Sequence, residues 1–260
     1  MKVLCIGDVV GSVGCKYLMK TLPDFKRKHG IDFVIANGEN SSDGNGITPS
    51  SAKQLFDCGV NVITSGNHAF RRRESYDYYD ECSELVRPAN YPEGTTPGRG
   101  YTVIDMLRYQ VCVINLMGTM YLEPLDCPFK TADRILEETQ KYKIKIVDFH
   151  AEATAEKKAM GFYLDGRVSA VFGTHTHVQT SDETILENGT GYITDVGMTG
   201  TVDSVLGVKK ELAIAKFKDK LPVRFDLADG KCHMDCVVFD IDVKSGKTVS
   251  VDRYVVKNKE

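Results

Sequence analysis

Five short apolar runs of this sequence each end in residues that could bind a metal ion or move a proton. These residues are Asp8, Glu39 with Asn40, Asn67 with His68, His150, and His175 with His177. Carboxylate, amide and imidazole groups suit Mn, Fe, Zn or Ni, and the absence of thiolates argues against a closed structural zinc site. Without His68 the set still holds seven ligands, more than one ion takes while keeping a reactive position open. We therefore predict two ions that share a carboxylate.

Each of these residues alone has a simpler interpretation. Asp8 alone would be a helix cap, Asn40 or Asn67 a turn residue, and His150 a hydrogen-bonded interior histidine. The pair His175-x-His177 is more specific, because it could reach two neighbouring ions from a non-helical segment. The combined pattern favours a binding site over an α/β domain whose polar strand ends are unconnected.

Two other motifs offer competing interpretations. The segment Gly7–Gly14 follows a strand and opens a helix, but its glycines are spaced Gly-x3-Gly-x2-Gly and no Walker lysine follows, so a dinucleotide cofactor is disfavoured. Cys232 and Cys236 flank a histidine without a second pair, which favours two thiols on a strand or turn over a zinc site.

The elements that must position the candidate ligands follow from the apolar pattern. Short β-branched runs predict buried strands, and amphipathic stretches between them predict helices, so we expect an α/β protein that forms one domain over residues 1–260. The expected strands are Val3–Ile6, Phe33–Ala36, Val60–Thr64, Tyr109–Leu116, Ile144–Phe149, Val168–Phe172 and Tyr192–Thr194. The expected helices are Val13–His29, Pro49–Cys58, Arg71–Leu85, Thr131–Tyr142 and Glu152–Met160. Ligands bind at the carboxyl ends of strands in open α/β sheets, where all the candidate residues fall.

The carboxyl-terminal part has a different pattern. Val223–Leu227, Cys236–Asp242 and Val249–Val256 predict a strand meander. The Gly- and Pro-containing segment Asn90–Gly100 is interpreted as a long connection, with a lid beside the site as the alternative.

Composition limits the partners and the compartment. The formal net charge is −3, so extended nucleic acid and an anionic membrane surface are disfavoured as partners. Eight cysteines without framework spacing indicate a reducing compartment, and the apolar runs are too short for us to expect a secretory leader or a membrane-spanning helix. We expect a cytoplasmic protein without membrane contact.

The motifs resemble those of the calcineurin-like metallophosphoesterases. The matching blocks are Asp8-Val9-Val10, Gly38-Glu39-Asn40, Gly66-Asn67-His68, His150 and Gly173–His177. Val10 replaces the first histidine of that superfamily, Glu39 replaces the bridging aspartate, and Thr174 is inserted before His175. In these departures the chain resembles the YmdB-like bacterial phosphodiesterases over nearly its whole length.

This resemblance implies a fold, a ligand set and a substrate. It implies a four-layer sandwich of two mixed β-sheets flanked by helices, with two Fe or Mn ions. Asp8, Glu39, Asn40 and His177 would hold one ion, and Glu39, Asn67, His150 and His175 the other. His68 would be the catalytic histidine, the substrates 2',3'- and 3',5'-cyclic nucleotides, and the assembly a homo-oligomer such as a dimer or tetramer.

The expected mechanism is attack of a metal-bridged hydroxide on phosphorus, with His68 protonating the leaving group. The alternatives are a phosphomonoesterase or nuclease on the same metal centre, and a regulatory protein with little turnover. Many relatives orient the histidine with an acid close behind it, but Ala69-Phe70-Arg71-Arg72-Arg73 follows here. A backbone carbonyl or a distant acid such as Asp195 is the expected substitute, with a reduced role of His68 as the alternative. The basic triplet is interpreted as a solvated helix face rather than a contact to a phosphate or an RNA end.

Overall fold

Two mixed β-sheets form the centre of the computed structural model, which describes residues 1–257. The first sheet has the strand order β2 (Asp8–Val9), β11 (Met198–Thr201), β12 (Cys232–Ile241), β1 (Lys2–Ile6), β3 (Phe33–Asn37), β4 (Val62–Thr64), and β13 (Thr248–Lys257) pairs with β12. The second has the order β5 (Tyr101–Asp105), β6 (Gln110–Met117), β7 (Ile144–His150), β8 (Ala170–Thr174), β10 (Gly191–Ile193), β9 (Thr184–Ile185). Strands β1, β3 and β4 are parallel, as are β6, β7, β8 and β10. The predicted mixed sheets are confirmed.

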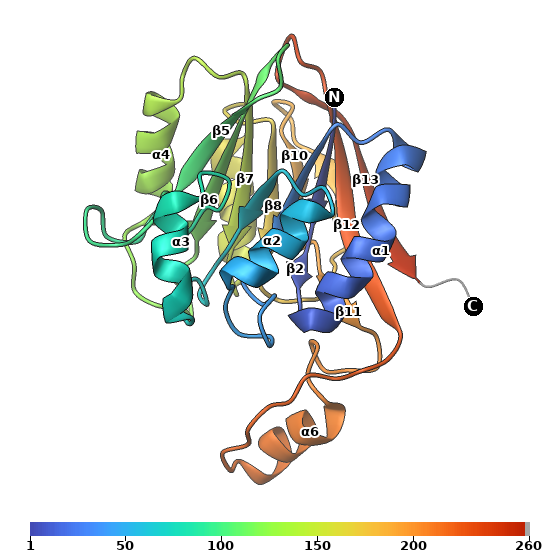
Figure 1. Cartoon of the computed structure of the whole chain (residues 1–260). Helices are drawn as coiled ribbons and strands as arrows, with labels where there is room; N and C mark the ends of the chain where they lie inside the picture. The colour runs from blue at the N-terminus through green and yellow to red at the C-terminus, as the bar shows by residue number, and fades with distance from the viewer. Residues whose placement is uncertain (258–260) are drawn as a thin grey trace.

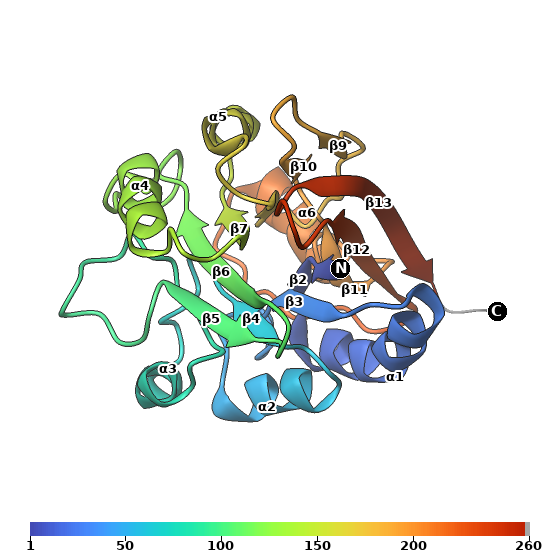
Figure 2. The ribbon, with the colours of Figure 1, turned by 90° about the horizontal axis from the view of Figure 1, so that it is seen from above.

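Helices cover the outer face of each sheet (Figures 1 and 2). Helices α1 (Gly11–His29) and α2 (Pro49–Asp57) pack on the first sheet, and α4 (Pro128–Glu138) and α5 (Thr154–Leu164) pack on the second. One apolar cluster lies between the sheets, and one lies between each sheet and its helices. The four-layer α/β sandwich expected from the resemblance is therefore present.

Alternating side chains explain why both faces of the central strands are apolar. On β1, Val3 and Cys5 point into the layer between the sheets, while Leu4 and Ile6 point toward the helices. Because successive side chains of a strand face opposite ways, a strand covered on both sides must be apolar throughout. This is why a continuous apolar run predicted a strand correctly.

The predicted helix Arg71–Leu85 is wrong in extent. The chain forms a 3-10 turn at Arg73–Ser75 and a short helix α3 (Tyr76–Glu81), and it becomes extended at Cys82. Leu85 then pairs with Ile63 beside β4, and the backbone N–H of Val86 donates to the carbonyl of Ile63. Leu85 and Val86 are therefore extended because they pair with the edge strand β4, and the helix ends before them.

Residues 202–231, between β11 and β12, form an excursion that we call the arm. Its helix α6 (Lys210–Asp219), which projects beyond the sheets near the start of α1 (Figure 1), was not predicted. The strands β5 and β11 were not predicted either. The strand predicted over Val223–Leu227 is wrong: only Leu227 forms a bridge, to Val208, because the arm offers no longer strand to pair with.

Three smaller expectations have clear outcomes. Residues 90–100 form a loop without helix or strand, in agreement with a long connection. Cys232 and Cys236 lie buried on β12, as expected for thiols on a strand, and all eight cysteines are free. Among residues 1–257, the helices are all too short or too polar to cross a bilayer.

Candidate metal centre

All eight predicted site residues lie together at the carboxyl edge of the parallel strands. The first sheet contributes Asp8 on β2, Glu39 and Asn40 after β3, and Asn67 and His68 after β4, and the second contributes His150 at the end of β7 with His175 and His177 after β8. Contacts between side chains link the residues of both sheets into one cluster. The two sheets therefore converge on a single site.

The Nε2 atom of His150 lies close to more polar atoms than it could hydrogen-bond with. Its Nε2 lies 2.9 Å from Oδ1 of Asn67, 3.1 Å from Nδ1 of His175 and 3.3 Å from Oε1 of Glu39. A ring nitrogen can donate one hydrogen bond at most. Two atoms that each lie about 2.1 Å from a shared ion are themselves about 3 Å apart, so this spacing fits four ligands of one cation.

The second group of candidate ligands surrounds Asn40. Its Nδ2 atom lies 3.2 Å from each of three atoms, Oδ1 of Asp8, Oε1 of Glu39 and Nε2 of His177. An amide coordinates metals through its oxygen, and here the oxygen faces His68 instead. Ligation by Asn40 therefore requires a half-turn of its amide group, whereas the other predicted ligands already present a suitable atom.

The outward nitrogen of each candidate histidine ligand contacts a hydrogen-bond acceptor. Nδ1 of His150 lies 2.9 Å from Oγ1 of Thr174, Nε2 of His175 lies 3.0 Å from Oε2 of Glu152, and Nδ1 of His177 lies 3.1 Å from the carbonyl oxygen of Leu206. A proton on each outward nitrogen leaves a lone pair on the inward one in the neutral ring. When these rings are neutral, three lone pairs and two buried carboxylates point at one small volume, which is the environment of a cation. The donor set fits the transition metals that the resemblance implies.

Buried polar residues behind His150 fix its orientation. The hydroxyl of Thr174 lies 2.7 Å from Oδ1 of Asp148, so it can donate there while accepting from His150. Asp148 also accepts hydrogen bonds from Thr64 and from the amide of Asn37. Burial raises the pKa of Asp148 to about 7. This network selects the His150 tautomer whose Nε2 faces the site.

The histidine loop after β8 has a strained backbone. His175 has a φ of 101° and His177 a φ of 62°, a region that side-chain-bearing residues rarely adopt. Two buried carboxylates hold the loop: Asp8 accepts from the N–H of His175, and Asp195 accepts from the N–H of Thr176. Asp195 is itself paired with the buried ammonium of Lys157 at 2.5 Å. Asp195 thus supports the ligand loop and does not orient His68, which corrects one of the two expectations for the group that orients this histidine.

His68 is oriented by candidate ligands rather than by an acid that follows it in sequence. Its Nδ1 lies 2.8 Å from Oδ1 of Asn40 and 3.2 Å from Oε1 of Glu39, and its backbone N–H donates to Oε2 of Glu39. The expected backbone carbonyl is therefore also wrong. Because both neighbours of Nδ1 are acceptors, that atom carries a proton, and Nε2 is left to exchange a proton with a substrate.

The basic triplet is only partly a solvated surface, and it does not lie on a helix face. The guanidinium of Arg72 donates to the carbonyls of Ser42 and Asn45 and pairs with Asp43 at 3.3 Å. Arg72 therefore holds the loop after Asn40 in place and lines the cavity beside the cluster.

The electrostatics of the metal-free cluster follow from its buried charges. Burial alone would raise the pKa of Glu39, but the charges of His150 and His68 outweigh it and hold that pKa well below its usual range. Burial would lower the pKa of His150, but Glu39, Asp8 and Asp148 outweigh it and raise the pKa to about 9. Burial and the charge of His150 lower the pKa of His175 to about 4. Without metal, His150 is therefore protonated at neutral pH.

A pH dependence of metal binding follows. A metal ion must displace the proton of His150, so the affinity of metal-stripped protein for Mn²⁺ should rise by about tenfold per pH unit up to the His150 pKa of about 9 and then level off. The sign is set by the raised pKa: protonation is favoured below it and competes with the metal. Calorimetric titration in buffers of different ionisation enthalpy measures both the affinity and the protons released. An affinity that does not change with pH would contradict this assignment of His150.

A cavity of about 1010 Å³ opens onto the cluster. Glu39, Asn40, His68, His175 and His177 line one part of it, and the arm lines another part with Leu206, Val208 and Arg224–Leu227. The loop 90–100 contributes no residue to this lining, so the lid interpretation receives no support. The cavity therefore offers a substrate both the cluster and a surface supplied by the arm.

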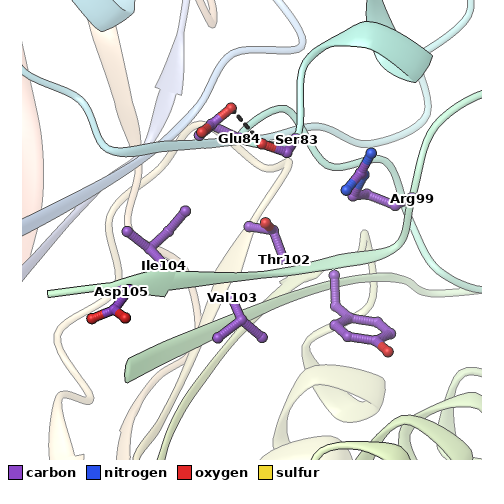
Figure 3. Close-up of a pocket in the computed structure, with 8 residues that line it drawn as sticks. Ser83, Glu84, Arg99, Thr102, Val103, Ile104 and Asp105 are labelled. Carbon is purple, nitrogen blue, oxygen red and sulfur yellow. Dashed lines mark hydrogen bonds between the residues drawn. The ribbon is translucent and has the colours of Figure 1, made fainter. Parts of the chain in front are cut away.

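A second cavity, of about 550 Å³, lies along the edge strand β5 (Figure 3). Ser83 and Glu84, which are joined by a hydrogen bond, face Thr102 and Ile104 across it. Its lining contains no histidine and none of the predicted site residues. It provides no chemistry comparable to that of the cluster.

The glycine-rich start of the chain serves packing. A Cβ atom on Gly11 would lie 2.2 Å from Cδ1 of Leu227 in the arm, and one on Gly14 would lie 2.5 Å from the carbonyl oxygen of Thr199. Val10, which stands where the superfamily has a histidine, lies against Gly207 of the arm. These glycines allow close approach of other segments, in agreement with the rejection of a dinucleotide motif.

Several supporting residues were missed by the sequence analysis. Thr174, Asp148 and Glu152 carried a weak signal, since Asp148 is an acid inside an apolar strand and a buried charge needs partners. The carbonyl of Leu206 carried none, because every residue has one.

Comparison with known proteins agrees with this geometry. A model of the YmdB-like protein family matches residues 4–254. The chain is 48% identical over 259 residues to the 2',3'-cyclic-nucleotide 2'-phosphodiesterase of Bacillus subtilis, covering 99% of this chain and 98% of that protein. Its structure matches a hypothetical protein from Thermus thermophilus at a TM-score of 0.94 and 42% identity, covering 100% of both chains. It also matches a phosphatase from Mycoplasma pneumoniae at a TM-score of 0.94 and 33% identity, covering 99% of this chain and 93% of that one. The fold is metallophosphoesterase-like.

Proposed function

Because this chain belongs to the YmdB-like protein family, we propose that it is a metal-dependent phosphodiesterase that hydrolyses 2',3'- or 3',5'-cyclic nucleotides. The observation that carries the proposal is the convergence of the inward nitrogens of three histidines with the carboxylates of Asp8 and Glu39 beside an open cavity. The relative from Bacillus subtilis supplies the substrate class.

The candidate ligands divide into two sets that share Glu39. Asn67, His150 and His175 would hold one ion with it, and Asp8, Asn40 and His177 would hold the other. When bound, such a pair of ions supplies Lewis acidity at phosphorus and a water molecule of lowered pKa. Glu39 shares its carboxylate between the sets, since its Oε1 atom lies close to both His150 and Asn40.

His68 would act on the leaving group. Its Nδ1 lies 3.2 Å from Oε1 of Glu39, which would remain its acceptor after the amide of Asn40 turns to ligate an ion, so Nε2 is free to give a proton to the departing sugar oxygen. An alkoxide is a poor leaving group, and a positioned acid contributes typically about 10²–10⁴-fold to such a step.

The proposal is tested by metal analysis of freshly purified protein together with a substrate panel. We expect about two Fe or Mn ions per chain and faster turnover of bis-p-nitrophenyl phosphate than of p-nitrophenyl phosphate, with 2',3'- and 3',5'-cyclic AMP as substrates. Faster turnover of the monoester would favour a phosphatase, and selective cleavage of oligonucleotides a nuclease. Absence of turnover with metals fully loaded would favour a regulatory protein.

Other features remain predictions that accompany this proposal. We propose that residues 1–260 act as one domain, in a homo-oligomer such as a dimer or tetramer, in the cytoplasm. The choice between Fe and Mn depends on metal supply as well as on the ligands, because mixed nitrogen and oxygen sites bind several divalent metals.

A further inference from the structure

The arm places an aromatic side chain beside the candidate metal centre. Phe225 lines the same cavity as Glu39, His68 and His177, and its side chain is 49% exposed. Exposing about half of a phenylalanine costs free energy that burial would recover, so a solvent-facing ring in a cavity is a candidate contact for an apolar ligand surface.

Backbone pairing anchors the segment that follows Phe225. The N–H of Lys209 donates to the carbonyl of Asp226, and the N–H of Ala228 donates to the carbonyl of Gly207. Leu227 anchors the same segment by packing against Gly11 and Gly44. Phe225 therefore stands next to a paired and anchored stretch of the arm and not on a free loop.

The base of the arm is also joined to the metal ligands. The carbonyl of Leu206 lies 3.1 Å from Nδ1 of His177, and Gly207 packs against Val10 beside Asp8. A ligand that reaches the cluster with its phosphate therefore has the arm beside it, and the arm supplies the aromatic part of the cavity lining for its organic part.

We infer that Phe225 is the platform on which the nucleobase of the substrate stacks, an inference that rests on the proposed function. Every base offers a π-face, so a stacking platform accepts all of them. The inferred substrate class is therefore nucleoside cyclic phosphates of any base, with purines preferred because their rings are larger. Arg224 adjoins Phe225 and lines the cavity too, and an arginine near a ring system adds cation–π attraction.

The test compares substrates with and without a base. For wild-type protein and Phe225→Ala, kcat/KM is measured on 2',3'-cyclic AMP and on glycerol 1,2-cyclic phosphate, which lacks a base. We expect the ratio of the two values to fall by about 5-fold to 150-fold in Phe225→Ala, the range for loss of base–aromatic stacking. Phe225→Tyr, which keeps the ring, should retain the ratio, whereas Phe225→Leu, which keeps only apolar character, should not.

Phe217→Ala is the matched control, because Phe217 is an exposed phenylalanine of α6 that does not line the cavity. It should leave the ratio unchanged. A ratio that stays constant in Phe225→Ala, or that falls equally in Phe217→Ala, would overturn the platform while leaving the phosphodiesterase proposal intact.

Calorimetric binding of adenosine 3'-monophosphate and of ribose 5-phosphate to the metal-loaded protein gives a readout that needs no turnover. Phe225→Ala should weaken binding of the first and not of the second. If wild-type protein hydrolysed neither cyclic ester, the proposed activity would fail, and this binding difference would still decide on the platform. Equal weakening of both ligands would refute it.

Discussion

Replacing Glu39 by alanine should remove both metal ions and lower kcat/KM for 2',3'-cyclic AMP by about 10³-fold or more, because bound ions contribute several kcal/mol to phosphoryl transfer. Glu39 belongs to both of the proposed ligand sets. Its Oε1 lies 3.3 Å from His150 and 3.2 Å from the amide of Asn40, and its side chain is almost fully buried. Elemental analysis after purification, followed by the kinetic assay, measures both effects.

Two variants sharpen this experiment. Glu39→Gln keeps the volume but loses the charge, so partial metal retention with low activity would separate the charge of the bridge from its shape. Glu187→Ala removes an exposed glutamate between β9 and β10 that does not line the cavity, and it should change neither metal content nor rate. Wild-type metal content in Glu39→Ala would remove this residue from the bridging position.

The clustering of the ligands could be predicted because parallel strands end at a common edge. Asp8, Glu39 and Asn67 follow three strands of one sheet, and that part of the prediction needed only the apolar runs and what stands after them. The apolar runs do not say that His150 and His175 come from a second sheet. The resemblance implied two sheets without assigning strands to them, and a strand buried on both faces has the same pattern in either sheet.

The arm could not be predicted for a physical reason. Helix α6 buries only Ala213, while Ile214 and Phe217 face solvent, so no apolar stripe marks it as a helix. The arm is held beside the cavity by the pairing of residues 207–209 with 226–228 and by the packing of Leu227 against Gly11 and Gly44. Short extended segments of this kind carry little signal in a single sequence.

The side chains that orient the functional residues were the least predictable part of the site. For His68 a backbone carbonyl or a distant acid such as Asp195 was expected. The acid that its ring contacts is instead Glu39, together with Asn40, and both had been assigned to the metals alone. Packing brings these side chains within reach of one another, and spacing along the chain does not reveal it. A residue that serves two roles is therefore found only when the geometry is known.

The second large effect is expected at His68, which is assigned to proton transfer and not to metal binding. His68→Ala should lower kcat for 2',3'-cyclic AMP by about 10²–10⁴-fold while both ions are retained, because the donor for the departing sugar oxygen is lost. The side chain of His68 lies beside the ligand sets without presenting an inward lone pair, since its Nδ1 faces two acceptors. Metal content and kcat are measured on the same preparation.

Substrates with different leaving groups show whether His68 donates a proton or only shapes the site. Nitrophenolate departs without protonation, so His68→Ala should lose much less activity on bis-p-nitrophenyl phosphate than on 2',3'-cyclic AMP. His29→Ala is the matched control, because His29 stacks on Phe25 at the end of α1, outside the cavity. Equal losses on the two substrates would mean that His68 shapes the site instead of donating a proton, and full activity on both would exclude it from the reaction.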